Sequence, residues 1–362
     1  MKMMNQYQLN LLKLSQVFFR GNQSDLALFD AAISWNWDTL FNYARQQCVS
    51  AIIFSVFENQ CIKPPLEILL KWYVQVELIK SNFEKQQKGC QEVEALCNEA
   101  NANMFVFKGL SLVNYYLNPA CREFGDLDIF TFNSSGSAHE KVNCLLESKG
   151  VRINYWDKHD VFNFGGIHVE HHSYFVNNDS KSGRRINDIL IHMVVGGDCV
   201  KVRDNLFFPT PDFNAIYLMV HSIEHMSYEG ITLKNALDYG SFLMHDGDKV
   251  HWEKVNAILK ETGWNIGFDA WVRVVEKVLD IDFSHFYIDC PNESLADKMF
   301  SAMLDFKQHD DLKCSLIKRI LMKVRRVFSH KWLFDHGVIP ASFWKDAIWP
   351  SLKTHIKHPS QF

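Results

Sequence analysis

The sequence predicts an α+β fold in which a region of short strands lies between two helical regions. Apolar residues recur at the helical period through residues 1–100 and again through residues 191–310. Residues 101–190 instead carry short apolar runs that are separated by glycines and polar turns. Residues 311–362 form a basic tail, so the chain divides into four regions.

The composition is that of a folded globular protein, with 47% hydrophobic and 22% charged residues. The net charge of −4 gives no strong nucleic-acid signature, because it supplies no overall basic field. No apolar run approaches the roughly 18 residues that a transmembrane span requires. The nine cysteines are scattered and form no C-x-x-C pair, so we expect neither a disulfide framework nor a zinc ribbon and predict a cytoplasmic location.

Residues 1–100 are predicted to be helical and to carry no catalytic constellation. Pro64–Pro65 breaks this region, and one long helix is expected from Leu66 to Ala100. The apolar positions of this helix that fall near the helical period are Leu69, Leu70, Tyr73, Val76 and Ile79. Its second half is polar, as in a helix that crosses the surface.

The first part of the strand region has the pattern strand, helix, strand. Met104–Phe107 and Gly125–Phe130 are apolar runs, and a helix is expected between them over Leu110–Leu117. Residues two apart on a strand share a face, so Asp126 and Asp128 point the same way. Two adjacent carboxylates repel each other unless a cation lies between them, and such hard oxygen ligands suit Mg²⁺. The pair therefore predicts a metal-dependent site for phosphoryl or nucleotidyl transfer.

Three more strands are expected in this region, at Val151–Trp156, Asp160–Phe164 and Ile167–His172. On the last of them, alternation places Glu170 and His172 on the same face. A metal site built on two aspartates lacks a carboxylate from a neighbouring strand. Glu170 is the best candidate for that third acid.

Residues 191–310 are expected to form helices, the first of which begins at Thr210–Pro211. This helix contains His221, Glu224 and His225 in an H-x-x-E-H motif, which is the form of an inverted zinc-peptidase motif. A zinc peptidase is thus an alternative function, although it needs a third ligand for which the sequence offers only Glu276 or scattered acids.

The C-terminal tail is strongly basic. Residues 311–362 contain ten lysines and arginines against three aspartates. Leu316–Phe328 has the pattern of a basic amphipathic helix, which can contact an acidic surface such as anionic lipid or nucleic acid. A solvated face of a C-terminal helix is the simpler interpretation.

Several of these motifs together resemble a known family. Apolar residues lead into Lys108–Gly109, and Arg122, Gly125–Asp128 and the strand Val169–His172 follow in order. This pattern resembles the bacterial uncharacterised nucleotidyltransferase family, which belongs to the DNA polymerase β-like nucleotidyltransferase superfamily. The resemblance extends over roughly residues 30–280 and leaves the basic tail outside it.

The resemblance implies a small mixed β-sheet, flanked by helices, in which Asp126, Asp128 and Glu170 are catalytic and hold divalent metal. The expected metal is Mg²⁺, with Mn²⁺ as the second candidate. Enzymes of this kind move an NMP group from an NTP such as ATP to an acceptor hydroxyl, and pyrophosphate leaves. The partners expected here are therefore an NTP and an acceptor that the sequence does not identify.

Further site residues follow from position within the family pattern. Lys108 and Gly109 stand where the superfamily has Gly-Ser, at the start of a helix that receives phosphates, and we expect them and Arg122 to bind the nucleotide. The candidate substrate contacts are His172, His221 and His225. Because Lys-Gly lacks the hydroxyl of Gly-Ser, a catalytically inactive nucleotide- or partner-binding module with the same fold is the main alternative.

Overall fold

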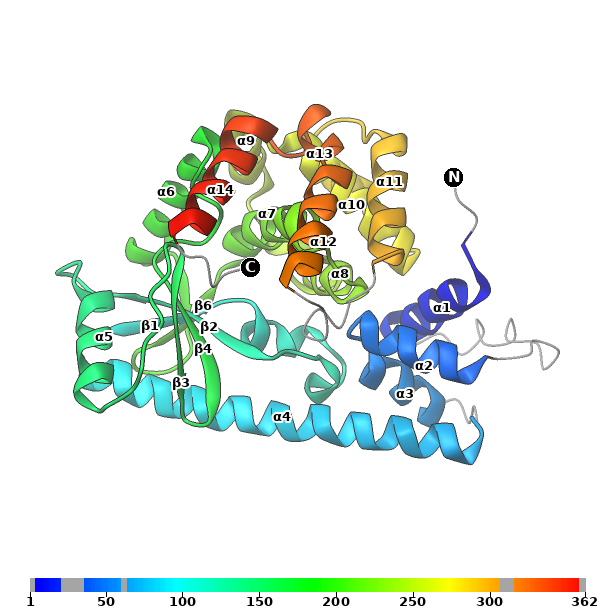
Figure 1. The fold of residues 1–362 in the computed structure, drawn as a ribbon, viewed down its shortest axis with the longest axis horizontal. Helices are drawn as coiled ribbons and strands as arrows, with labels where there is room; N and C mark the ends of the chain where they lie inside the picture. The colour runs from blue at the N-terminus through cyan, green and yellow to red at the C-terminus, as the bar shows by residue number, and fades with distance from the viewer. Residues whose placement is uncertain (1–3, 21–35, 60–63, 307–315, 358–362) are drawn as a thin grey trace.

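The computed structural model describes residues 4–20, 36–59, 64–306 and 316–357, and it has the predicted α+β fold. A six-stranded mixed sheet lies on one side of the molecule, and the long helix α4 (Leu66–Glu99) runs beneath it in the view of Figure 1. The N-terminal helices lie at the other end of α4, and the C-terminal helices lie above. Helix α4 therefore connects the sheet to the N-terminal helices.

The sheet has the strand order β3-β4-β2-β1-β6-β5. Its strands are β1 (Asn103–Val106), β2 (Asp126–Phe132), β3 (His159–Phe164), β4 (Ile167–His172), β5 (Cys199–Lys201) and β6 (Leu206–Pro209). Strand β2 pairs antiparallel with β1 and parallel with β4, while β1 pairs parallel with β6. The two central strands thus have a hydrogen-bonded neighbour on each side, which fixes their position.

One face of the sheet is covered by α4 and α5 (Ala138–Ser148). Leu127 of β2 and Val169 of β4 belong to the apolar core on this side. Gly89 of α4 approaches the sheet so closely that an added Cβ would lie 2.6 Å from Ile167. Because strand residues alternate, the neighbours of these buried residues in β2 and β4 face the opposite side.

The other face of the sheet packs against α7 (Pro211–Tyr228) through aromatic rings. The ring of Phe107, just after β1, lies 5.0 Å from that of Phe175 and 5.2 Å from that of Tyr217, measured between centroids. Thr210 is the N-cap of α7, as the sequence predicts. This aromatic layer sets the spacing between α7 and the sheet.

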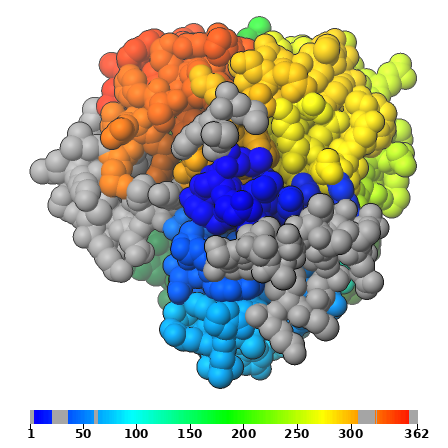
Figure 2. Space-filling view, turned by 90° about the vertical axis from the view of Figure 1, so that its right-hand side faces the viewer, coloured from blue at the N-terminus to red at the C-terminus, as the bar shows by residue number. Residues whose placement is uncertain are grey.

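The remaining helices of the N-terminal and C-terminal regions share one apolar core. They are α1 (Gln6–Arg20), α2 (Trp37–Gln46), α3 (Ser50–Asn59), α6 (Lys181–Val195), α8 (Leu233–Asp246), α9 (Trp252–Thr262), α10 (Asn265–Leu279) and α11 (Glu293–Leu304). Helix α1 packs against both α3 and α10. Figure 2 shows the dark blue α1 directly against the yellow C-terminal helices. The division of the chain into four regions stays a prediction.

Two local predictions are wrong. Residues 110–117 form no α-helix, because the short connection between β1 and β2 is made of the 3₁₀ helices η2 (Gly109–Tyr115) and η3 (Pro119–Cys121). Val151–Trp156 is not a strand and makes only an isolated bridge, at Asn154. Val151 and Ile153 pack against the apolar core, but the other side chains of this segment are exposed.

Sequence reasoning also missed β5, β6 and α6. These two strands have three and four residues, which is too short for alternation to be recognised. Both strands lie beyond residue 190, where the predicted core region ends. The sheet therefore continues into a stretch that was expected to be helical.

Helix α4 is confirmed, but only part of its expected apolar face is buried: Val76 and Ile79 lie in the core and Leu69 packs against it. Ile68, Trp72 and Val76 point into the core, while Leu70 and Tyr73 are 56% and 52% exposed. The N-terminal half of the helix is apolar on both sides, so periodicity alone does not identify the buried side.

The described part of the basic tail folds onto the C-terminal helices. Its elements are α12 (Leu316–Ser329), α13 (Trp332–Asp335), the π-helix η7 (Phe343–Ile348) and α14 (Trp349–Lys357). Helix α12 packs on α7, and Arg326 donates a hydrogen bond of 2.7 Å to the carbonyl of Glu229. Contact of the tail with an acidic surface stays a prediction. Among the described helices, none combines the length and the apolarity needed to cross a membrane.

Candidate functional site

Strands β2 and β4 form the first wall of the candidate site. Alternation turns Asp126 and Asp128 to one side of β2, opposite to the buried Leu127. The parallel register sets Asp128 directly beside Glu170 of β4. Carboxylate oxygens of the three acids lie within 4.8 Å of one another. The acids that the sequence singled out thus come together, while their role as metal ligands stays a prediction.

Two further side chains hold Asp128 in place. Lys108 Nζ lies 2.6 Å from Asp128 Oδ1, and His172 Nε2 lies 3.0 Å from the same oxygen. His172 Nε2 also lies 3.3 Å from Glu170 Oε2. We refer to these four residues and Asp126 as the sheet wall. Its two basic groups contact the same carboxylate, so the carboxylate of Asp126 is left without either of them.

Lys108 reaches Asp128 from an uncommon backbone conformation. Its φ of +59° is rare for a residue with a side chain, and Gly109 follows with φ +36°. In this turn the N–H of Phe107 donates to the carbonyl of Asp128 at 3.3 Å. Because a 3₁₀ helix replaces the α-helix expected after the turn, phosphate binding by Lys108 and Gly109 stays a prediction.

The two aspartates of β2 have pKa values shifted in opposite directions. Burial raises the pKa of Asp128, but Lys108 and His172 outweigh burial and hold this pKa well below its usual range. Burial, together with the charge of Asp128, raises the pKa of Asp126. Asp126 has no hydrogen-bond or ion-pair partner within the described residues. A divalent cation between the acids would relieve this repulsion.

A second group with the spacing of metal ligands overlaps the first. His159 of β3 brings a ring nitrogen within 4.8 Å of ligand atoms on Glu170 and His172. Burial lowers the pKa of His159 to about 4, so its ring is neutral at pH 7. Sequence reasoning missed this residue. The Gly165–Gly166 turn could have revealed it, because this turn joins β3 and β4 in a hairpin. Counting residues outward from the turn on both strands sets His159 opposite His172.

Arg122 lines the site, but its guanidinium is already engaged. Nε and Nη2 each donate a hydrogen bond of 2.8 Å to a carboxylate oxygen of Asp238, and the hydroxyl of Tyr116 donates to the same aspartate at 2.6 Å. Arg122 is 4% exposed, and its Nη1 has no partner within the described residues. Nucleotide binding by Arg122 stays a prediction that involves Nη1.

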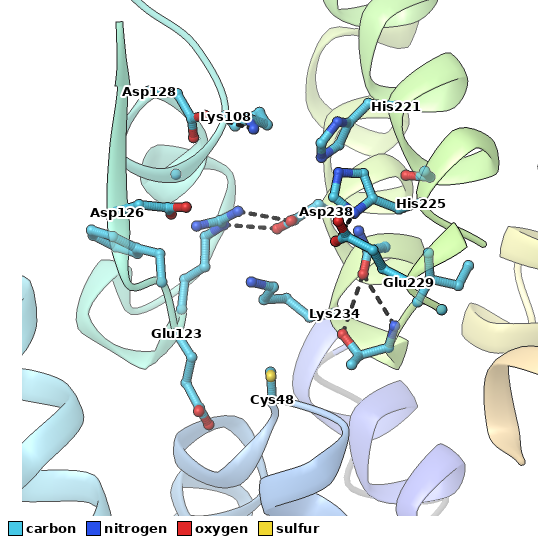
Figure 3. A pocket seen from close by; sticks show the side chains of 18 of the residues that line it. Cys48, Lys108, Glu123, Asp126, Asp128, His221, His225, Glu229, Lys234 and Asp238 are labelled. Atoms are coloured by element: carbon cyan, nitrogen blue, oxygen red, sulfur yellow. Dashed lines mark hydrogen bonds and ion pairs between the residues drawn. The ribbon is translucent and has the colours of Figure 1, made fainter. Parts of the chain in front are cut away.

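Helices α7 and α8 and the loop between them form the second wall, opposite the sheet wall in Figure 3. We refer to His221, His225, Glu229, Lys234 and Asp238 as the helical wall. His221 and His225 lie one turn apart, with ring centroids separated by 4.2 Å. His225 Nδ1 lies 3.0 Å from a carboxylate oxygen of Glu229. Burial lowers the pKa of His221 well below its usual range, so this ring is neutral, and its Nδ1 has no partner within the described residues.

The H-x-x-E-H motif on α7 does not assemble a metal centre. The carboxylate of Glu224 accepts hydrogen bonds of 3.1 Å from the backbone N–H of Asn177. Within the described parts of the chain, the side-chain groups able to hold a metal are the two at the sheet wall, and neither includes His221 or His225. The zinc-peptidase alternative therefore lacks its third ligand.

A cavity of about 1320 Å³ lies between the two walls. It is also lined by Lys158 and Lys234, to which sequence reasoning assigned no role. Neither ammonium group has an ion-pair partner among the described residues. No local motif marks either lysine, since Lys158 lies in the loop before β3 and Lys234 in the first turn of α8. Only the fold brings the two lysines to one cavity.

Comparison with known proteins identifies the family of the chain. The model of a family described as uncharacterised nucleotidyltransferase matches residues 34–280. The matched stretch covers well over half of the sequence and contains both walls of the cavity. No match was found among curated proteins or among solved structures. The chain therefore belongs to the uncharacterised nucleotidyltransferase family.

Proposed function

We propose that the protein is a metal-dependent nucleotidyltransferase, which moves an NMP group from an NTP to an acceptor hydroxyl. The observation that carries this proposal is the cluster of Asp126, Asp128 and Glu170, whose carboxylate oxygens lie within 4.8 Å at the edge of a large cavity. Membership of the family supports a function of the nucleotidyltransferase type.

The three carboxylates fit a divalent metal. Mg²⁺ and Mn²⁺ both prefer oxygen ligands, and Asp126 offers a carboxylate that no protein group occupies. The neutral ring of His159 lies close enough to Glu170 and His172 to add a nitrogen ligand, which suits Mn²⁺ better than Mg²⁺. When bound, such a metal supplies neutralisation of phosphate charge and lowers the pKa of the acceptor hydroxyl.

The nucleotide side of the site would use the groups around Asp128. Lys108 and His172 orient the Asp128 carboxylate through contacts of 2.6 and 3.0 Å. Lys158 carries an ammonium group without an ion-pair partner among the described residues, and we assign it to the triphosphate. Gly109 and Arg122, both of which line the cavity, are further candidates for phosphate contacts, as the family pattern implies.

The three histidines expected to contact substrate differ in availability. Both ring nitrogens of His172 are engaged, one with Asp128 and the other with the carbonyl of Tyr174 at 3.3 Å, so His172 acts as a positioning residue. His225 is engaged with Glu229. His221 combines a neutral ring with an Nδ1 that has no partner within the described residues, and its charged neighbours include Lys108 and Lys158, so we assign it to the nucleotide as a hydrogen-bonding group.

The alternative is a module that binds a nucleotide or a partner without catalysis. The observation that favours it is the 2.6 Å contact between Lys108 and Asp128, which occupies an oxygen that metal ligation requires. ATP as the first NTP to test and a cytoplasmic location also belong to the proposal. The cysteines within the described residues are free thiols.

A transfer assay tests the proposed function. The protein is incubated with each α-labelled NTP, Mg²⁺ or Mn²⁺, and a cell lysate as the source of acceptors. We expect the wild type to transfer label and Asp126→Asn to lose transfer, with the exposed Glu261→Gln as a matched control. Metal-dependent nucleotide binding without transfer would favour the non-catalytic module. A wild-type protein that shows no nucleotide binding and no transfer would contradict the proposal.

A further inference from the structure

Lys158 and Lys234, which have no ion-pair partner among the described residues, place positive charge at different positions around the three carboxylates. Lys158 directly precedes β3, which pairs with β4, and its carbonyl accepts a hydrogen bond of 2.9 Å from the N–H of Ser173 just after β4, so Lys158 lies on the β4 side of the acids. Lys234 instead acts on the carboxyls of Glu123 and Asp126. The two cations therefore belong to opposite ends of the acid cluster.

Lys234 lies on the Asp126 side of the cavity. In Figure 3 the side chain of Lys234 extends from α8 into the cavity, towards the region between Asp126 and Cys48. Arg45 and Gln46 of α2 line the same end of the cavity. We refer to Arg45, Gln46 and Lys234 as the α2 end of the cavity.

The charges at the α2 end of the cavity leave an excess of positive charge. Arg122 is neutralised by its two hydrogen bonds to Asp238. Glu123 is the acid at this end: Lys234 and Arg45 both act on its carboxylate, which accepts a hydrogen bond of 2.8 Å from the backbone N–H of Ser50. With Asp126 assigned to the metal, the two cations therefore outnumber this one acid. Within the described residues Lys234 and Arg45 have no ion-pair partner.

In nucleotidyl transfer, the triphosphate of the nucleotide occupies only one of these two cationic positions. The acceptor oxygen forms a bond to the α-phosphorus, the α–β phosphoanhydride bond breaks, and pyrophosphate leaves with the electron pair while the hydroxyl proton passes to a base. The triphosphate is one polyanion, and Lys158 provides a cation for it. A second unpaired cationic position, reached through Lys234, calls for a second anionic group.

We infer that the acceptor is a hydroxyl compound that carries a phosphate or carboxylate, and that Lys234 and Arg45 bind this anionic group. The inference rests on the proposed function, because it assigns the nucleotide to the other end of the acids. The side-chain amide of Gln46 lines the same end and has no hydrogen-bond partner within the described residues, so it can bind hydroxyls of the same compound. A cationic acceptor would be repelled by Lys234 and Arg45, and a neutral one would leave their charges unused.

Anion binding by the full-length protein tests the inference. The protein is first saturated with Mg²⁺ and a non-hydrolysable NTP analogue, so that the triphosphate position is filled. Inorganic phosphate is then titrated by calorimetry, followed by glucose, glucosamine and glucose 6-phosphate, which share one ring and differ in charge. We expect phosphate and glucose 6-phosphate to bind, and Lys234→Ala to weaken both by about tenfold or more. Lys234→Gln keeps a polar side chain but removes its charge, and it should have the same effect.

Two control variants separate the two anion positions. Lys158→Ala should weaken binding of the NTP analogue and leave the affinity for phosphate within about twofold of wild type. Lys234→Ala should weaken phosphate binding and leave the affinity for the NTP analogue within about twofold. Lys249→Ala removes an exposed lysine that pairs with Asp246, and it should change neither. Thermal melts establish that each variant is folded.

The possible outcomes distinguish the inference from the proposed function. Failure of phosphate to bind, equal binding by wild type and Lys234→Ala, or preferential binding of glucosamine would each overturn the inference. If the NTP analogue does not bind the wild type in Mg²⁺, the proposed function fails instead. In that case phosphate titration of Lys158→Ala and of the Lys158→Ala/Lys234→Ala double variant still reports on the Lys234 position alone.

Discussion

The sheet wall and the helical wall face each other across one cavity, yet they balance charge in different ways. On the helical wall each acid has a partner, since Asp238 binds Arg122 and Glu229 contacts His225. The sheet wall instead groups three acids, and its two basic side chains both contact Asp128. The sheet wall thus keeps unbalanced negative charge, and the helical wall keeps Lys234, which has no ion-pair partner in the described part of the chain.

This difference indicates that the two walls have different roles. Acids on paired strands are held at a spacing that the hydrogen-bonded register dictates, which suits a metal site that tolerates little variation. Within the described residues, the helical wall holds its acids in pairs and adds the ammonium of Lys234 and the unpartnered Nδ1 of His221, groups that recognise a ligand more readily than they bind a metal. We therefore expect substitutions on the sheet wall to affect chemistry and those on the helical wall to affect binding or stability.

The largest effect is expected from Asp126→Asn on the sheet wall. Loss of this metal ligand should reduce nucleotidyl transfer by about a thousandfold, because a metal contributes several kcal/mol to transition-state stabilisation. Stability should not fall, since the carboxylate has no hydrogen-bond or ion-pair partner within the described residues. The transfer rate measures the loss of activity, and urea unfolding of the same preparation measures the stability. Retention of more than a tenth of the activity would contradict the assignment.

The next largest effect is expected from Asp238→Ala, which acts on the helical wall. The variant leaves the buried Arg122 guanidinium without its carboxylate, so the free energy of unfolding should fall by about 3–5 kcal/mol. The control Glu261→Ala breaks an exposed ion pair with Arg185 and should cost less than about 1 kcal/mol. Urea unfolding monitored by tryptophan fluorescence compares the two. Equal losses would mean that the buried pair is not structural.

A smaller effect should appear in the pH dependence of stability, measured in EDTA. Asp126 has a raised pKa in the folded protein, so its ionisation destabilises the fold as pH rises above the ordinary value near 3.9. Asp128 has a depressed pKa, so its stabilisation is present above that value and is lost as pH falls through the folded pKa.

Asp126→Asn should therefore become more stable than wild type as pH rises, by about 1.4 kcal/mol for each unit of the Asp126 shift. The gain should level off above the raised pKa and vanish in acid. Urea unfolding at a series of pH values gives the difference. A constant difference between the two proteins would show that Asp126 titrates normally.

The smallest effect is expected from His225→Ala at the partly exposed end of the helical wall. Its pair with Glu229 is accessible to solvent, so the free energy of unfolding should fall by less than about 1 kcal/mol. The variant also tests the zinc alternative. Purified wild type and His225→Ala should contain no stoichiometric zinc by elemental analysis. Stoichiometric zinc that disappears in the variant would falsify our assignment of α7.

The sequence was most informative where strand alternation operates. Alternation was enough to predict that Asp126 and Asp128 share one face of β2 and that Glu170 shares a face of β4 with His172, and the parallel register brings the three acids together. Alternation gives no information on which strands are neighbours, however. The pairing of β1 with β6 joins Met104 to Leu206, and two strands as short as β5 and β6 show no recognisable pattern.

Contacts between distant residues could not be predicted from local patterns. Arg122 has the local features of a phosphate-binding residue, but its partner Asp238 lies 116 positions further along the chain. Lys158 and Lys234 belong to no motif, and their shared cavity depends on the packing of α7 and α8 against the sheet. For α4, both faces of the first half are apolar, so only tertiary packing decides that Trp72 is buried and Leu70 is exposed.

The strand order has a consequence for biosynthesis. Strand β1 lies between β2 and β6, and the residues of β6 are made about 100 positions after those of β1. Until the ribosome has released Leu206–Pro209, β1 has one open edge that can pair with another chain and promote aggregation. Fragments that end at residue 190 would keep this open edge permanently. A recombinant fragment of the sheet should therefore extend at least to Pro209.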